Sequence, residues 1–319
     1  MKISERKAEA LVALLFLLPN FVGFLLFTSV PVLASLYFSF THWDLFHRPQ
    51  FVGLQNFISL LGFAHQGGNL IANDPFFWQY LYNTAFLMIG IPFTIAGSLV
   101  LAIALNRKMR GVVVYRTIYF LPTITAGVAV LIVWKWLYNT DIGLFNVIID
   151  DLGIWLHVHL PSLFPVAFTG PDWLGRVEWA KPSLIIMGFM MSVGGGNMIL
   201  YLAALQGVPR ELYEAANLDG ASGWQQFRHI TWPLISPTTF FIGIMSLISG
   251  FQGGFVTSYV MTQGGPAGST TTIEYYIFNK GFTMFNMGYA SAIAWFLFLV
   301  ILVITLLTYR YGGRTVTYA

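Results

Sequence analysis

Long apolar runs without charged residues alternate with short polar segments along this chain of 319 residues. A helix needs about 20 mostly apolar residues to cross the hydrocarbon core of a bilayer, and six runs are long enough. The pattern predicts an all-α integral membrane protein that forms a single domain (1–319) with six transmembrane helices. We place these helices at 10–40, 77–106, 113–137, 182–206, 236–261 and 284–310.

The basic residues between the runs indicate how the spans are oriented. Cytoplasmic segments of membrane proteins carry an excess of Lys and Arg. Six spans place both termini on the same side, together with 107–116 and 207–235, and these segments hold eleven of the sixteen basic residues. We therefore expect both termini and the loop 207–235 in the cytoplasm, and external loops at 41–76 and 138–181.

Two stretches allow another interpretation. The first apolar run follows basic residues, as the core of a secretory signal does, but it is much longer than the usual core of about 7–15 residues. The segment 152–171 is also free of charge, and as a seventh span it would move 207–235 to the outside. It contains His157, His159 and internal prolines, so an external or surface-lying segment is favoured.

Composition supports the membrane interpretation. Hydrophobic residues make up 56% of the chain and charged residues 9%, whereas a soluble domain carries about 25% charged residues. Cysteine is absent, which excludes a disulfide framework and thiol chemistry within this chain. The net charge of +3 is small and does not suggest nucleic acid as a partner.

One polar stretch, 209–233, separates two of the apolar runs and predicts two short helices joined by a tight turn. Pro209 suits a first helical turn, where its missing N–H costs nothing. Gly220 follows an Asp and ends the first helix, because glycine tolerates a left-handed backbone. Ser222 and Gln225 have the spacing of a capping box, which starts the second helix.

The same stretch carries a motif. Glu214-Ala215-Ala216, followed by Gly220 and Pro233, resembles the EAA motif of permease subunits of binding-protein-dependent ABC importers. The longer sequence Leu-Tyr-Glu-Ala-Ala-Asn-Leu-Asp-Gly-Ala-Ser resembles the carbohydrate-uptake branch. Two other stretches resemble that branch, Thr-Gln-Gly-Gly-Pro at 262–266 and Gly-Tyr-Ala-Ser-Ala at 288–292. The chain departs from the family at Trp232, where Leu is usual.

This resemblance implies a type I ABC importer fold and a coupling helix that docks on a cytoplasmic ATPase subunit. The residues implied in this coupling are Glu214, Ala215, Ala216, Asp219 and Gly220. Alanines allow close approach of a partner, and a carboxylate can pair with a basic group on it. A solvated loop, in which Glu-Ala-Ala merely favours a helix, is the alternative; the full pattern favours docking.

Polar residues and glycines within the apolar runs indicate a solute pathway, because polar groups are costly in lipid. Ser192 and Asn197 flank three consecutive glycines, and Gln252 lies among others. Similarity to the maltose permease, carried over by spacing, adds positions near 189–196 and 247–254. The predicted pathway residues are Phe189, Ser192, Gly196, Asn197, Leu247, Gly250, Phe251, Gln252 and Gly254. Where the maltose permease has asparagines, this chain has mainly glycine and aromatic residues, which argues against maltose; tight helix packing is the alternative role for the glycines.

No catalytic or metal-binding pattern is evident. His157 and His159 are two residues apart, whereas a His-Glu-x-x-His zinc site needs a spacing of four. The phosphate-binding sequence Gly-x-x-x-x-Gly-Lys-Ser/Thr is missing, so we expect ATP and magnesium to bind a partner ATPase and this chain to have no cofactor of its own.

These features predict a permease subunit that forms half of the translocation pathway of an ATP-driven sugar importer. The expected location is the cytoplasmic (inner) membrane of a bacterium or archaeon. The resemblance implies four kinds of partner besides the lipid bilayer: a second permease, two ATPase subunits, an extracytoplasmic solute-binding protein and a sugar. The same importer class for glycerol phosphate, a polyol or a polyamine is an alternative; a secondary transporter is disfavoured because the charge-free runs lack ion-coupling carboxylates.

Overall fold

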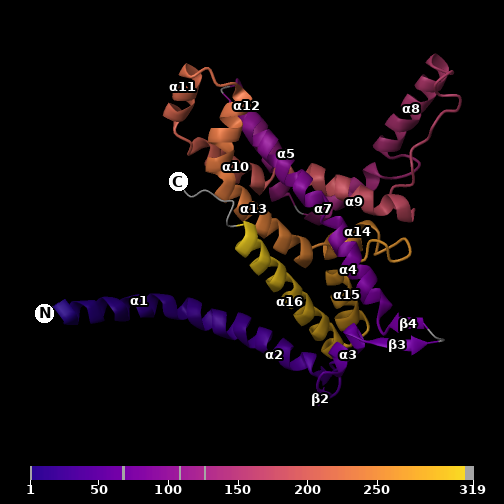
Figure 1. Cartoon of the computed structure of the whole chain (residues 1–319). Coiled ribbons are helices and arrows are strands. Elements are labelled where there is room, and N and C mark those ends of the chain that lie inside the picture. Colours follow the sequence, from indigo (N-terminus) through magenta and orange to yellow (C-terminus); the bar gives the residue numbers. More distant parts are fainter. Residues whose placement is uncertain (1, 67–68, 108, 126, 313–319) are drawn as a thin grey trace. The chain divides into compact units, whose positions relative to one another are not determined.

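The computed structural model describes residues 2–66, 69–107, 109–125 and 127–312 (Figure 1). Its contacts divide the chain into two compact units, which the sequence pattern does not signal. The first unit comprises Met1–Pro75 and Ile277–Phe298, and the second comprises Phe76–Tyr276 and Leu299–Ala319.

The first unit begins with a long helical arm. Helix α1 (Lys2–Phe24) continues through a π-helical turn η1 (Leu25–Ser29) into α2 (Val30–Ser39), and the three run on from one another in Figure 1. Lys7–Ser39 is a candidate membrane span, and 0% of its most apolar stretch is buried against other parts of the chain. The arm therefore exposes its apolar side chains to lipid or to another chain.

The external loop predicted at 41–76 has secondary structure that the sequence does not reveal. Strand β1 (Thr41–His42) pairs antiparallel with β2 (Gln50–Phe51), and β3 (Phe63–Gln66) pairs antiparallel with β4 (Asn69–Ala72). Helix α3 (Gln55–Leu61) lies between the hairpins in sequence. Strands of two to four residues are too short to show an alternating pattern of apolar and polar positions.

This loop is held to the start of α16 (Met287–Gly312) within the first unit. The Trp43 carbonyl accepts a hydrogen bond from the Met287 N–H at 2.9 Å. The Tyr289 hydroxyl donates to a carboxylate oxygen of Asp74 at 2.5 Å, and both side chains are buried. Buried polar groups of this kind are stable only when paired, so these bonds fix the loop to the helix.

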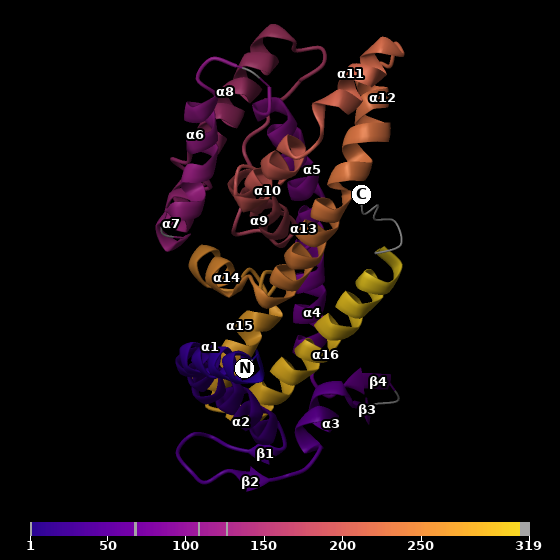
Figure 2. The same cartoon turned by 90° about the vertical axis from the view of Figure 1, so that its left-hand side faces the viewer.

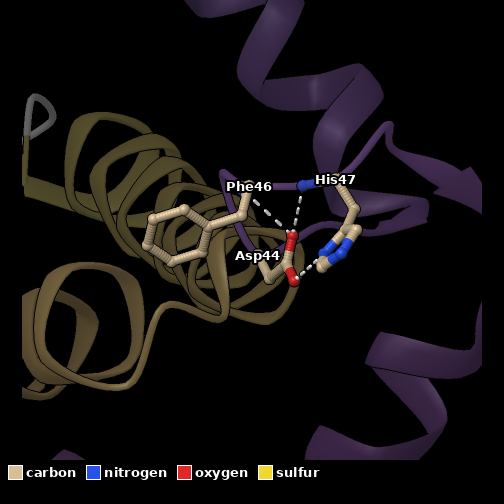
Figure 3. A network of polar contacts seen from close by, with 3 residues as sticks. All are labelled: Asp44, Phe46 and His47. Atoms are coloured by element: carbon tan, nitrogen blue, oxygen red, sulfur yellow. Dashed lines mark hydrogen bonds and ion pairs between the residues drawn. The ribbon is translucent and has the colours of Figure 1, made fainter.

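A smaller polar network shapes the turn after β1 (Figure 3). One Asp44 carboxylate oxygen accepts hydrogen bonds from the backbone N–H groups of Phe46 at 3.1 Å and His47 at 2.9 Å. The other oxygen lies 2.6 Å from the His47 Nδ1. The His47 side chain, followed by its backbone N–H, lowers the pKa of Asp44 from 3.8 to about 2.

We expect His47→Ala to return the Asp44 pKa toward 3.8. In the unsubstituted chain the carboxylate and its bonds persist above pH 3.8 and are lost as the pH falls through about 2. In the variant this loss occurs at higher pH. A carbon-13 NMR titration of labelled aspartate, with Asp44→Asn to assign the signal, measures the difference, and an unshifted midpoint would show that His47 does not stabilise the carboxylate.

The second unit contains most of the apolar helices. Two candidate spans are continuous, Pro75–Leu105, made of α4 (Pro75–Leu87) and α5 (Gly90–Leu105), and Gly223–Gln252. Two further helix pairs are each bent by more than 40°: α6 (Val112–Ile124) with α7 (Gly127–Leu137), and α9 (Val177–Ser192) with α10 (Gly196–Gln206). With the arm and α16, the described residues hold four candidate spans, or six if each bent pair counts as one.

The segment 152–171 does not form a seventh candidate span among the described residues. Its first part belongs to α8 (Leu144–His159), and the remainder up to Pro171 is not helical. The prolines of this segment follow the helix end, where they cannot donate a helical hydrogen bond.

The fifth apolar run differs from the predicted helix 236–261. Helical structure starts earlier, at α12 (Gly223–Gln226), and continues through η2 (Phe227–Thr231) into α13 (Trp232–Gln252). It then breaks before α14 (Phe255–Met261), because Gly253 is extended and Gly254 has φ +102°. A positive φ is readily accessible only to glycine, so this break is encoded in the glycine pair. Helix α15 (Ile273–Phe278) and the turn η3 (Asn279–Thr283) follow.

A hydrophobic core of the second unit lies among α5, α10 and α13 (Figure 2). Its buried members include Ala102 on α5, Met198 and Tyr201 on α10, and Ile235 and Ile242 on α13. This packing positions both the polar segment at the end of α10 and the cavity described below.

Candidate functional site

The polar segment 207–235, here called the coupling segment, has the predicted form of two short helices and a turn. Helix α11 (Arg210–Leu218) follows Pro209, which stands just before the helix, and Gly220 turns the chain with φ +76°. The Ser222 hydroxyl accepts from the Gln225 N–H, while the Gln225 side chain accepts from the Ser222 N–H at 2.7 Å. The capping box expected from the sequence is therefore present at the start of α12.

The residues predicted to contact an ATPase lie on the surface of this segment. Glu214, Ala215, Asp219 and Gly220 are exposed, and Ala216 is half-buried. Four large apolar side chains of the segment are also exposed, of which Leu218 at 90% and Trp224 at 68% are the most exposed. Apolar groups beside a carboxylate and small residues suit docking against another protein rather than solvent.

Hydrogen bonds tie α11 to the start of the following span. The Tyr213 hydroxyl lies 2.8 Å from the Thr231 hydroxyl, and Thr231 is buried. The Gln226 amide donates to the Asn217 side chain at 2.7 Å and to the Ala221 carbonyl at 3.1 Å. These bonds attach α11 to α12 and η2, which run on into α13 (Figure 2).

Tyr213→Phe is expected to loosen this attachment. A hydrogen bond of this kind stabilises by about 1 kcal/mol, so its loss should raise the opening equilibrium of α11 about fivefold. Amide hydrogen exchange of residues 210–218 in the purified transporter measures this. Thr231→Val should have the same effect, and the double variant should add nothing further; additive effects would show that the two hydroxyls act independently.

A central cavity of about 440 Å³ lies within the second unit, among α4, α5, α7, α9, α10, α13 and α14. Five of the nine predicted pathway residues line it, namely Phe189, Ser192, Asn197, Gly250 and Gly254. The other four, Gly196, Leu247, Phe251 and Gln252, do not. All of the described residues that line the cavity are uncharged.

The rotation of α13 explains why Leu247, Phe251 and Gln252 do not line the cavity. Spacing from the motifs suggested a face with Leu247, Gly250, Phe251 and Gly254. Gly250 and Gly254 line the cavity, but Ser246 and Ser249 face it in place of Leu247 and Phe251. One residue of offset rotates a helix by about 100°, which is enough to exchange lining for packing residues. Phe251 is consequently buried and Gln252 exposed elsewhere.

Apart from Ser192, sequence reasoning missed the hydroxyl groups of the cavity. Threonines and serines from several elements line it, namely Thr84, Thr94, Ser246, Ser249, Thr257, Ser258 and Thr272. The recurrence of small polar residues every three or four positions in the fifth run is a signal that would have found part of this set. The buried Asn83 of α4 has a structural role, because its side chain donates to the carbonyls of Gly268 at 2.8 Å and Thr271 at 3.0 Å.

The glycines next to the cavity have different surroundings. A Cβ on Gly194 would lie 2.4 Å from the Tyr119 carbonyl oxygen, so this glycine permits close approach of α6. A Cβ on Gly188 or Gly196 would meet nothing within 4 Å. Close packing therefore accounts for Gly194, but not for the other two.

Residues 8–316 match the family described as the binding-protein-dependent transport system inner membrane component. The chain belongs to this family. Its members are transport permease subunits, not enzymes, and they are inner membrane components of ABC transporters. Within the described residues, no group of three or more His, Asp or Glu is placed to hold a metal ion.

Similar proteins include several bacterial permeases. The chain is 33% identical to the probable ABC transporter permease protein YesP of Bacillus subtilis, over 95% of this chain and 91% of that protein. It is 37% identical to the lactose transport system permease protein LacF of Rhizobium radiobacter, over 77% and 80% of the two chains. It is 29% identical to the sn-glycerol-3-phosphate permease protein UgpA of Yersinia enterocolitica, over 95% of each chain.

Solved structures confirm the predicted fold class. A chain in the crystal structure of a bacterial ABC transporter involved in the import of the acidic polysaccharide alginate matches with a TM-score of 0.77 and 22% identity, over 98% of this chain and 99% of that chain. A second structure, of the alginate transporter with a pentasaccharide-bound periplasmic protein, gives a TM-score of 0.79 at 22% identity, over 98% of each chain. The chain therefore has the all-α type I ABC importer permease fold.

Proposed function

We propose that this chain is one of two permease subunits in an ATP-driven importer of an uncharged, sugar-like solute. The observation that carries the proposal is the central cavity, which combines hydroxyl and amide side chains with apolar walls and has no charged lining residue among those described. Relatives named for lactose and for starch degradation products support a saccharide.

The chemistry of the cavity favours a neutral solute over an anionic one. Sugar hydroxyls can exchange hydrogen bonds with Ser192, Asn197 and Ser249, and Phe189 offers an apolar surface for the face of a sugar ring. A phosphate ester or uronate would lose water in this cavity without gaining a cationic partner, which is costly. A glycerol phosphate or acidic sugar substrate is therefore disfavoured, although relatives and structural neighbours named for such solutes exist.

The coupling segment supports a cytoplasmic ATPase partner. Its exposed Glu214, Ala215 and Leu218 form a small docking surface, and ATP with magnesium would bind that partner. Closure of two ATPase subunits would push α11, which is tied to η2 and α13, and α13 lines the cavity. Movement of α13 would then open the cavity to alternate sides of the membrane.

The remaining partners follow from exposed surfaces and charge. The apolar arm of α1, η1 and α2 offers a surface for a second permease as well as for lipid. The excess of basic residues in 107–116, in the coupling segment and at the two ends supports cytoplasmic termini. The external loops 41–76 and 138–181 would then face a solute-binding protein that delivers the sugar and contributes to specificity.

Purification from mildly solubilised membranes followed by mass spectrometry tests the assembly. We expect a second permease and an ATPase to accompany the chain. Calorimetry of the associated binding protein should then detect neutral saccharides and not phosphate esters. Tight binding of a phosphate ester alone would contradict the proposed solute class while leaving the importer assembly intact.

A further inference from the structure

A second cavity, also of about 440 Å³, lies between α6 and α10 and shares no lining residue with the central cavity. Its walls are mainly apolar, but Arg116, Thr117 and Gln206 contribute polar groups. We call this cavity the Arg116 groove. Thr117 and Gln206 are exposed and Arg116 is half-buried, so the groove opens on the surface of the described chain.

The guanidinium of Arg116 is only partly satisfied by the protein. One terminal nitrogen, Nη2, donates to the Leu105 carbonyl at 2.8 Å, which joins the end of α5 to α6. The Nε atom is buried and has no hydrogen-bond partner. A guanidinium has five N–H donors, and the described residues give Arg116 no other hydrogen bond than that of Nη2. Its remaining Nη donors therefore suit a ligand with acceptor oxygens at the groove.

No nearby carboxylate neutralises this arginine. The sequence contains no Asp or Glu between Asp74 and Asp141, and α10 contains none either. Among the described residues, Arg116 takes part in no ion pair. Two further basic residues, Arg107 and Arg110, are exposed on the connection before α6. Arg116, Arg107 and Arg110 therefore place positive charge near the groove, and neither of the helices that line it, α6 and α10, carries a carboxylate.

In the orientation proposed above, the groove is expected at the level of the cytoplasmic membrane surface. Arg116 stands in the second turn of α6, and Gln206 is the last residue of α10. The excess of basic residues places these ends on the cytoplasmic side. A ligand there meets a charged group at the interface and apolar walls that extend into the bilayer.

We propose that the Arg116 groove binds the phosphate group of an anionic phospholipid from the cytoplasmic leaflet. Arg116 pairs with phosphate oxygens through its free donors, and an acyl chain lies along the apolar walls between α6 and α10. Basic pockets between helices on the cytoplasmic side are suited to anionic headgroups. Because α10 leads directly into the coupling segment, the lipid would brace the base of α11.

Native mass spectrometry of the complete transporter in detergent, titrated with phosphatidylglycerol, tests this proposal. Arg116→Gln should weaken binding about tenfold or more, because a charge-assisted pair is lost. Arg110→Gln is the matched control, since it removes the same charge from a residue outside the groove, and should change binding less than about threefold. Ala203→Phe, which fills the groove and keeps Arg116, should also weaken binding, and it serves as the second variant if Arg116→Gln does not accumulate.

Three results would overturn the proposal. Equal losses in Arg116→Gln and Arg110→Gln would indicate diffuse attraction to basic residues instead of a site. Displacement of the lipid by inorganic phosphate alone would indicate a free-anion site. Protection of a single cysteine introduced at Ala203 from a membrane-permeant maleimide, in lipid-free transporter, would indicate that another protein chain covers the groove; the chain has no other cysteine.

Discussion

Glu214→Lys is expected to reduce ATP-driven uptake by at least about tenfold while the amount of chain in the membrane stays unchanged. Glu214 is exposed on α11, so its replacement should leave the fold intact. A reversed charge at a docking surface that matches a basic partner costs several kcal/mol, and about 1.4 kcal/mol already corresponds to tenfold. Radiolabelled solute uptake, normalised to chain abundance in the membrane, gives the effect.

Two further substitutions sharpen this prediction. Glu9→Lys reverses the same charge at another exposed position predicted to face the cytoplasm, and should leave uptake close to normal. Gly220→Pro should abolish coupling by another route, because proline cannot adopt φ +76° and lacks the N–H that Gly220 donates to the Asn217 carbonyl. Normal uptake with both Glu214→Lys and Gly220→Pro would remove the coupling segment from the mechanism.

Gly188→Trp is expected to block transport by filling the central cavity. Gly188 lines the cavity, and a Cβ there meets nothing within 4 Å, so an indole can enter without displacing the backbone. Trp also has a higher helix propensity than Gly, so α9 should remain helical. Forcing solute and indole into one space costs roughly 1–3 kcal/mol, which lowers uptake roughly 5- to 150-fold.

Gly243→Trp is the matched control for this prediction. Gly243 also lies in a helix of the second unit, and a Cβ there likewise meets nothing within 4 Å, but it does not line the cavity. Uptake by the Gly243 variant should stay close to normal. Both variants should be present in the membrane at normal abundance. If Gly188→Trp then transports as well as Gly243→Trp, the pathway lies outside this cavity.

The helices that could be predicted are those whose location depends on the average composition of many consecutive residues. The apolar runs gave the location of the arm and of α16, because a bilayer requires about 20 apolar residues whatever their order. The capping box at Ser222 and the turn at Gly220 were also predictable, because both depend on local backbone chemistry. The short strands between Thr41 and Ala72 were not, since runs of two to four residues are too short to show an alternating pattern.

The candidate site was predictable to a smaller extent. Motif spacing placed Ser192 and Gly250 in the cavity lining, and the cost of a polar residue in lipid indicated Asn197. It missed the rotation of α13, which depends on how Ile235 and Ile242 pack in the core. The contribution of Thr84 and Thr94 from α4 and α5 could not be found from the motifs, because no motif covers those helices and tertiary packing alone brings them to the cavity.

The most direct test of the account is solute uptake into liposomes that contain this chain with the permease, ATPase and binding protein that copurify with it. We expect uptake of a neutral saccharide only when ATP is supplied on the side of the liposome membrane that carries the ATPase. This uptake should fall to background in Glu214→Lys. Uptake by this chain alone, without ATP or an ATPase partner, would contradict coupling through α11.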